Sequence, residues 1–186
     1  MKKTIALALA CLLLLVFAAC AKQAPGPEPG TPGTVAVSFD FERQSGYSTN
    51  QFAVWIEDME GNVVKTLFAT RFTAAGGYEK RPGSLTNWVD KAVRSGITDA
   101  DAVAGATPKS GPCAYVWDCT DERGNAVPAG AYCFFVEHTF RRGAGSGAGQ
   151  VEWGEIEIGG ADTVAQAMEI DDELDLISNI KAEYTA

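Results

Sequence analysis

The sequence predicts an all-β domain: an immunoglobulin-like, antiparallel β-sandwich of about seven strands with one inserted helix. Three observations predict this fold class. Several short segments alternate apolar and polar side chains with the period of two that is typical of a strand. Turn signals such as Gly-Asn and Pro-Ala-Gly separate these segments. A single stretch around Trp88 has the spacing of an amphipathic helix instead.

The chain begins with features of an export signal. Lys2 and Lys3 precede an apolar run over residues 5–17, which is too short to span a bilayer comfortably. Small residues follow and lead directly into Cys20, an order that resembles the bacterial lipobox. The resemblance implies that residues 1–19 are a lipoprotein signal peptide and that Cys20 carries the lipid that binds the chain to a membrane.

Residues 20–33 are expected to be the lipidated cysteine and a linker. Residues 21–33 read AKQAPGPEPGTPG, with almost no apolar side chain that could enter a core. Such a Pro- and Gly-rich segment is extended, and at about 3.1 Å per residue it reaches roughly 40 Å. The folded domain is therefore expected over residues 34–186.

Three strands are predicted in the first half of this domain. Residues 34–42 place four apolar side chains on one face, and residues 51–57 and 62–70 are further strands. Gly61-Asn62 is the tip of the hairpin turn between the last two.

Four more strands are predicted in the second half, over residues 113–118, 131–138, 151–158 and 176–184. The acidic residues 162–173 fit either a loop or a short helix. A glycine-rich run follows Arg141 and Arg142, so these two residues are expected in a mobile loop after a strand. Such a loop could contact a partner.

The inserted helix is predicted to start at Ser84, a good N-cap residue, and to end at Gly96. Leu85, Trp88 and Ala92 lie on one of its faces, and this face is expected to pack on a sheet. Trp55 and Trp117 are also expected in the core or half-buried in a sheet.

Composition limits the function. The chain has 24 acidic and 15 basic residues, a net charge of −9, and Lys2 and Lys3 belong to the expected signal. This charge disfavours binding to nucleic acid and tight contact with anionic lipid headgroups.

The chain has one histidine, His138, which is expected at the surface, so no transition-metal site is predicted. Asp118, Asp121 and their neighbours weakly resemble a calcium loop, although such aspartates more commonly accept backbone hydrogen bonds.

Three cysteines remain after Cys20: Cys113, Cys119 and Cys133. The number is odd, so at least one thiol stays free or pairs between molecules. Cys119 and Cys133 bracket a hairpin, and the sequence leaves open whether they form a disulfide.

Long stretches of the domain resemble a known family. The segments NQFAVWIEDMEGNVVKTLFATRFTAAGGYEKRP, DAVAGATPKSG and YVWDCTDERGNAVPAGAYCFFVE are similar to the extracytoplasmic domain of unknown function family 2271. The resemblance covers nearly all of residues 34–186. Two pieces around the Gly-Asn turns are also similar to the immunoglobulin-like domain of flagellar hook-capping proteins, which supports the sandwich and not a function.

Within this resemblance, residues 101–107 (DAVAGAT) are similar to the D-x-x-[ST]-G-A-T sequence at which a bacterial flavin transferase attaches FMN to a threonine. The resemblance implies that Thr107 is the attachment point and that Asp101, Gly105 and Ala106 belong to the cofactor-binding segment. Lys109 is positioned to neutralise the phosphate. Ala104 stands where Ser or Thr is usual.

The chemistry requires an accessible hydroxyl, because Thr107 has to enter the active site of another enzyme. Gly105 allows a close approach of the backbone, and Pro108 favours an extended Thr107 with its side chain directed outward. Trp55, Trp88 and Tyr115 are aromatic candidates to flank the flavin ring, but the sequence does not place them, and core packing is the expectation for the two tryptophans.

The sequence therefore predicts an extracytoplasmic, membrane-tethered electron carrier with covalent FMN. Its partners would be the membrane, a flavin transferase and a membrane redox protein, and it would not be an enzyme in its own right. The alternative is a non-catalytic, immunoglobulin-like interaction module of the cell envelope. A third interpretation, thiol redox chemistry, requires two sulfur atoms within bonding distance at the surface. Exposure of the Thr107 side chain distinguishes the first two.

Overall fold

The computed structural model describes residues 30–45, 48–142, 147–168 and 176–186. The expected signal peptide, Cys20 and most of the linker lie outside these residues. The end of the linker contacts the domain: Thr31 donates its N–H to the carbonyl of Val127 (3.0 Å), and Tyr184 donates its hydroxyl to the carbonyl of Pro32 (2.7 Å). In the described part of the chain, no helix is long and apolar enough to cross a membrane.

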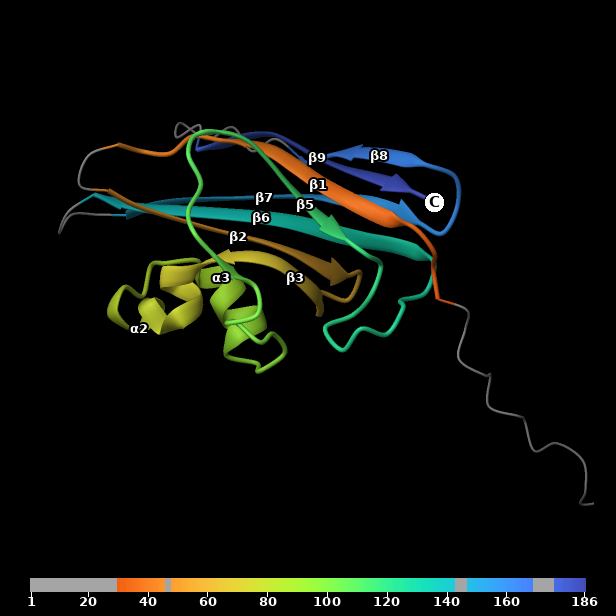
Figure 1. Cartoon of the computed structure of the whole chain (residues 1–186), viewed down its shortest axis with the longest axis horizontal. Coiled ribbons are helices and arrows are strands. Elements are labelled where there is room, and N and C mark those ends of the chain that lie inside the picture. Colours follow the sequence, from red (N-terminus) through yellow and green to blue (C-terminus); the bar gives the residue numbers. More distant parts are fainter. Residues whose placement is uncertain (1–29, 46–47, 143–146, 169–175) are drawn as a thin grey trace, which may run out of the picture.

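Two β-sheets form a sandwich (Figure 1), which confirms the predicted all-β class. The four-stranded sheet has the order β5 (Gly111–Trp117), β1 (Thr34–Phe41), β9 (Ile177–Thr185) and β8 (Thr163–Gln166). The five-stranded sheet has the order β4 (Ala104–Gly105), β3 (Val63–Thr70), β2 (Ser48–Asp58), β6 (Gly130–Arg142) and β7 (Gly147–Ile158). Neighbouring strands are antiparallel except β3 and β4, which are parallel.

All seven predicted strands are present, and two short edge strands were not predicted. These are β4 and β8, whose four residues or fewer are too short for an alternating pattern to be recognised. Residues 162–173 were expected to be a loop or a helix; their first part contains β8, and residues 169–173 lie outside the described residues. Strand β6 continues through Arg141 and Arg142, so these residues pair with β2 and are not in a loop.

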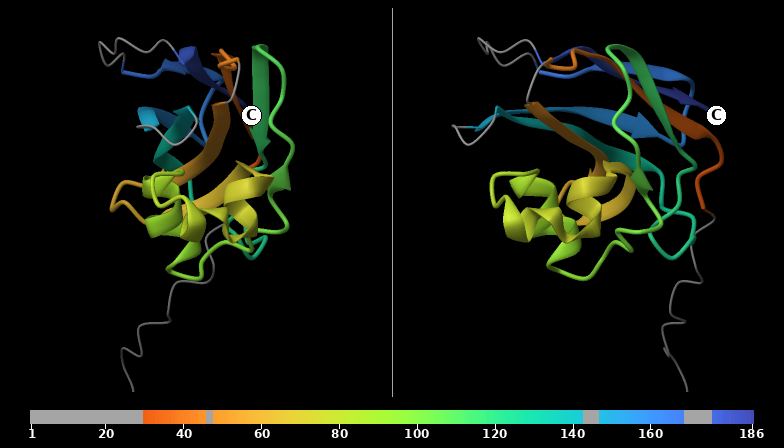
Figure 2. Two further views of the ribbon diagram at one scale, coloured as in Figure 1. Left: turned by 90° about the vertical axis from the view of Figure 1, so that its left-hand side faces the viewer. Right: turned by 60° about the vertical axis from the view of Figure 1, so that its left-hand side comes forward.

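Helical segments cover the outer face of the five-stranded sheet (Figures 1 and 2). They comprise η1 (Thr73–Gly77) with α2 (Tyr78–Lys80), and α3 (Thr86–Trp88) with η2 (Val89–Val93). We call these residues, 73–80 and 86–93, the helical layer. Only the second segment was predicted. The first contains Gly76 and Gly77 and has no apolar stripe, so no periodicity indicated it.

The predicted helix begins differently from expectation. Leu85, with a φ of 51°, occupies the N-cap position without a side-chain cap, and Ser84 does not cap the helix. The carboxylate of Glu137 on β6 acts instead, accepting hydrogen bonds from the N–H groups of Asn87 (3.2 Å) and Trp88 (2.9 Å). A residue far away in sequence therefore accepts hydrogen bonds from the N–H groups of the first turn, which have no partner within the helix. The predicted end is confirmed, because Gly96 has a φ of 71° and follows the last turn.

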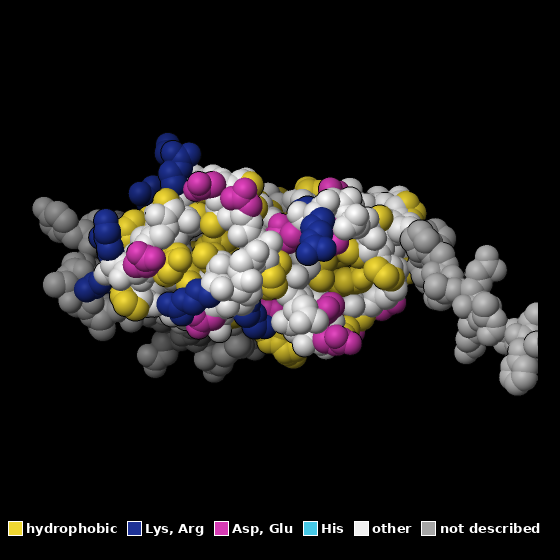
Figure 3. Space-filling view, turned by 90° about the horizontal axis from the view of Figure 1, so that it is seen from below, with side chains coloured by type: hydrophobic (Ala, Val, Ile, Leu, Met, Phe, Trp, Pro, Cys, Tyr) yellow, Lys and Arg dark blue, Asp and Glu magenta, His cyan; other side chains and the backbone are white. Residues whose placement is uncertain are grey.

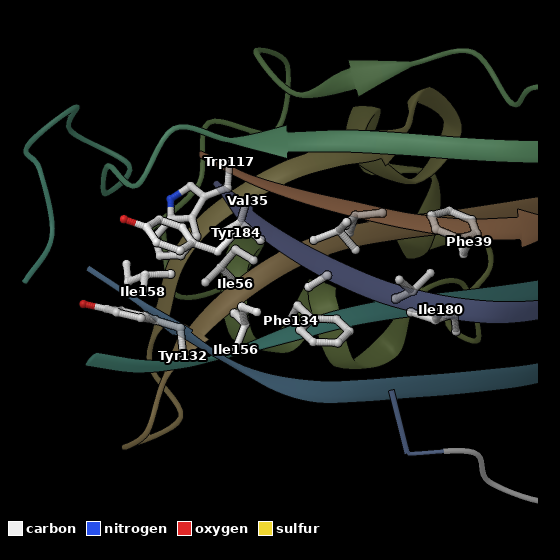
Figure 4. Close-up of a cluster of buried hydrophobic side chains, with 14 of the residues drawn as sticks. Val35, Phe39, Ile56, Trp117, Tyr132, Phe134, Ile156, Ile158, Ile180 and Tyr184 are labelled. Carbon is white, nitrogen blue, oxygen red and sulfur yellow. The ribbon is translucent and has the colours of Figure 1, made fainter. Parts of the chain in front are cut away.

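Apolar side chains form two cores. The larger one fills the space between the sheets and includes Trp117, which meets Tyr132 edge to face (Figure 4). The second lies between the five-stranded sheet and the helical layer and contains Trp55 and Trp88. The core positions expected for these three tryptophans are confirmed, since each is at most 1% exposed.

His138 was expected at the surface, and this prediction was wrong. The residue lies at the inner face of β6, is 0% exposed, and its ring centroid is 5.1 Å from that of Phe41. The backbone of Leu176 is the polar group near its ring, and no hydrogen bond of good geometry reaches either ring nitrogen from the described residues. Burial lowers the pKa of His138 to about 4, so the folded chain holds the ring neutral.

A pH dependence of stability follows from His138. Its pKa falls from the ordinary 6.5 to about 4 on folding, so the unfolded state binds an additional proton at pH values between these two. The free energy of unfolding should therefore decrease as the pH falls through this window, by about 1.4 kcal/mol per pH unit from this group.

Urea unfolding of the wild type and His138→Phe at about pH 7 and about pH 5 isolates this contribution. Phe retains an aromatic ring beside Phe41 and cannot be protonated, so the variant should lose less stability on acidification. Parallel pH dependences of the two proteins would contradict a buried, neutral His138.

Glu137 gives a second expectation. Glu137→Leu keeps a side chain of similar size but leaves the N–H groups of Asn87 and Trp88 without their acceptor. The substitution should reduce the free energy of unfolding by about 2–4 kcal/mol. Glu157→Leu, at an exposed position of β7, is the matched control. Chemical denaturation measures both variants. Equal losses, or a more stable Glu137→Leu protein, would show that the carboxylate does not hold the helix in place.

Candidate functional site

The segment that resembles a flavin-attachment sequence connects the helical layer to the edges of both sheets. Asp101 lies in an exposed turn, where its N–H donates to Oδ1 of Asp99 (3.2 Å) and its carbonyl accepts the N–H of Ala104 (3.4 Å). The carboxylate of Asp101 has no ion pair in the described residues. A second protein can therefore reach this side chain.

Gly105 approaches an aromatic ring closely. It pairs with Thr70 in the parallel β4–β3 ladder, and a Cβ atom at this position would overlap the ring of Phe68. The expected close approach at Gly105 therefore exists, but its neighbour in the described chain is an aromatic side chain.

Thr107 is half-buried, which differs from the outward orientation that Pro108 predicted. Its Oγ1 donates to the carbonyl oxygen of Asn50 on β2 at 3.2 Å. Hydroxyl donors commonly lie about 2.5–3.0 Å from their acceptors, so this bond is long and little energy is needed to release the hydroxyl. Ala106 and Lys109 on either side are exposed. The residue is thus neither fully presented to solvent nor sequestered in a core.

Aromatic rings line the adjacent side of the sandwich. The ring of Phe68 on β3 lies 4.9 Å from that of Phe52 and 4.7 Å from that of Tyr115 on β5. Phe68 and Tyr115 are only half-buried. Burial raises the pKa of the Tyr115 phenol, which stays protonated at neutral pH. The segment that carries Thr107 starts beside Phe68 and leads into the strand that carries Tyr115.

The structure separates the three aromatic candidates. Trp55 and Trp88 are enclosed in the core beneath the helical layer, so of the three candidates only Tyr115 is partly exposed beside this segment. Sequence reasoning missed Phe68. No local sequence pattern indicates the position of Phe68 beside Gly105. That position depends on the pairing of β3 with β4, which lie more than thirty residues apart in the chain.

The three cysteines of the domain are free thiols. Cys119 is buried, Cys113 and Cys133 are half-buried, and burial raises the pKa of all three. Thiols with raised pKa values are poor nucleophiles at neutral pH. The thiol redox interpretation, which required two sulfur atoms at bonding distance, therefore lacks support.

The carboxylates that resembled a calcium loop are engaged in hydrogen bonds. Asp121 accepts the N–H groups of Arg123 and Asn125 (both 2.8 Å), and Asp118 accepts the hydroxyl of Thr120 (2.6 Å). These bonds lower the pKa of both aspartates. Within the described residues, no three His, Cys, Asp or Glu side chains are grouped so that they could hold a metal ion.

Comparison with known proteins gives one match. A family model described as "Predicted periplasmic protein (DUF2271)" matches residues 33–153, which include the turn at Asp101 and the segment around Thr107. No curated protein and no solved structure matches the chain.

Gly105 provides a test of this local packing. Gly105→Ala places a methyl group against the Phe68 ring, which packs against the rings of Phe52 and Tyr115, and should lower the free energy of unfolding by about 1–3 kcal/mol. Gly160→Ala, where an added Cβ meets nothing within 4 Å, is the control. Thermal and denaturant unfolding measure both. If the two variants are equally stable, the segment does not pack on Phe68.

Proposed function

The chain belongs to the DUF2271 family of predicted periplasmic proteins, and we propose that it is an extracytoplasmic electron carrier with FMN attached covalently to Thr107. Lipid on Cys20 would tether it to a membrane, and residues 20–33 would hold the domain away from the lipid surface. The family description agrees with the extracytoplasmic location expected from the first 20 residues.

The position of Thr107 carries this proposal. Its hydroxyl lies in a connecting segment outside any helix or strand. This hydroxyl donates one long hydrogen bond to the backbone carbonyl of Asn50. The exposed side chains of Asp101, Ala106 and Lys109 offer a transferase a surface on both sides of the acceptor. A small outward movement of this segment releases the hydroxyl without breaking a core.

The attachment reaction requires only this hydroxyl from the chain. The Thr107 oxygen would form a bond to the phosphorus of the FMN half of FAD, AMP would leave, and the hydroxyl proton would be released. Lys109, two residues further, is an exposed cation that can offset the charge of the resulting phosphodiester. Asp101 and Gly105 would serve recognition by the transferase.

The adjacent aromatic side chains support a role in holding the flavin. Phe68 and Tyr115 are half-buried, and aromatic rings stack favourably on one another. The flavin would supply the redox chemistry when bound, whereas the chain would orient the ring and limit its contact with water.

A second candidate, a non-catalytic interaction module, is favoured by a different observation. Val116 on the edge strand β5 and Val164 on the edge strand β8 are 61% and 64% exposed. Exposed edge strands with outward apolar side chains are suited to pairing with a strand of another protein.

Intact mass distinguishes the two candidates. The exported chain, produced together with a flavin transferase, should gain the mass of FMN, and Thr107→Ala should abolish the gain. Thr86→Ala, at an exposed position of α3, should leave it unchanged. Ala104→Ser restores the residue usual at this place in the motif and should increase the modified fraction. An unmodified wild type, with a known acceptor domain labelled in parallel, would contradict flavin attachment and favour the interaction module.

A further inference from the structure

A cavity opens between the helical layer and the end of the five-stranded sheet at which β2 begins and β6 ends. Its volume is about 160 Å³. Arg81 and Arg141 line it together with the hydroxyl-bearing residues Thr49, Ser84 and Thr139. We propose that this cavity binds a small organic anion, whose carboxylate or phosphate group is held by the two guanidinium groups.

No carboxylate of the described residues compensates the positive charge at this cavity. In the described part of the molecule, neither Arg81 nor Arg141 forms an ion pair with a carboxylate. Glu137, the buried acid on the same strand as Arg141, already accepts the hydrogen bonds of the helix start. In Figure 3, Lys and Arg side chains lie over the half of this face that carries α2 and α3, with Asp and Glu side chains between them. Two arginines without an ion pair among the described residues, in a chain of net charge −9, indicate a site for a negative ligand.

Arg81 is held in place before any ligand arrives. Its Nη1 donates to Oγ1 of Thr49 (2.6 Å), and its guanidinium carbon lies 4.6 Å from the centre of the Phe72 ring. These two contacts fix the plane of the group and leave several of its five N–H donors available. A preorganised donor loses less conformational entropy when it binds, so more of the interaction energy appears as affinity.

The dimensions and the walls of the cavity define the class of ligand. A planar guanidinium matches the paired oxygen atoms of a carboxylate or a phosphate group. A cavity of about 150 Å³ holds one benzene ring, so this cavity of about 160 Å³ encloses one group of that size, and the rest of the ligand lies at its mouth. Pro82 and Phe140 supply the apolar part of the wall. The ligand is therefore an organic acid or a phosphate ester with a small apolar body, and not a bare inorganic ion.

This site is distinct from the flavin-attachment segment. No residue of the segment 101–109 lines the cavity, and Thr107 contacts β2 through the backbone carbonyl of Asn50. The hydroxyl of Thr49 accepts the hydrogen bond of Arg81, which directly follows α2 of the helical layer. The inference rests on the cavity and its charges alone and holds whether or not Thr107 carries FMN.

Three probes with the same aromatic body test the proposal. Calorimetric titration of the full chain should show saturable binding of phenyl phosphate, benzoate or both, and no binding of the neutral benzyl alcohol. The tighter anion identifies the preferred head group. Arg81→Gln and Arg141→Gln should each weaken that binding by about tenfold or more, because each removes a charge-assisted hydrogen bond.

Arg123→Gln is the matched control, because it removes one positive charge in the exposed turn between β5 and β6 and should leave the dissociation constant unchanged. Arg141 has no side-chain hydrogen bond or ion pair with the described residues, so its variant should keep the unfolding midpoint of the wild type. Three results would overturn the proposal: neither anion binds, benzyl alcohol binds as tightly as the anions, or Arg141→Gln binds as tightly as Arg123→Gln.

Discussion

Burial of strand β2 on both of its faces is the constraint on which the rest of the structure depends. Phe52, Val54 and Ile56 point into the space between the sheets, whereas Ala53 and Trp55 point the other way, and all five are at most 1% exposed. An antiparallel sheet in a sandwich commonly has one face in water. Here the second face is apolar, so a further layer has to cover it, and the helical layer does so.

Covering this face also buries polar groups, and these groups determine how the layer is seated. Glu57 is 2% exposed and accepts hydrogen bonds from Nε1 of Trp55 (2.6 Å) and from Nζ of Lys91 (2.5 Å). Glu137 accepts the N–H of Trp88 at the start of the same helical segment. Buried carboxylates are tolerated only with such partners, so the two acids position the layer from two neighbouring strands. Both features proposed as functional follow from this arrangement: the segment with Thr107 leads back from the layer to the sheets, and the arginine-lined cavity lies at the layer's end.

The two functional features differ in how far the sequence indicated them. The DAVAGAT segment was recognisable as a motif, and its placement in a connection outside the main strands was expected. The half-buried state of Thr107 was not, because it depends on the carbonyl of Asn50, 57 residues earlier in the chain. The cavity was not predicted at all. Arg141 was assigned to a mobile loop because of the glycines that follow it, and only its pairing with β2 brings it to the same cavity as Arg81.

The sequence by itself determined the all-β class and the positions of seven strands, because alternation of side chains is a local property with a period of two. It also determined the end of the helix at Gly96, since a left-handed residue there needs no distant partner. Only the tertiary structure decided that Glu137 caps that helix, that His138 is buried, that Phe68 lies against Gly105 and that two arginines share a cavity. Each of these depends on contacts between strands or layers remote in sequence, which local periodicity does not encode.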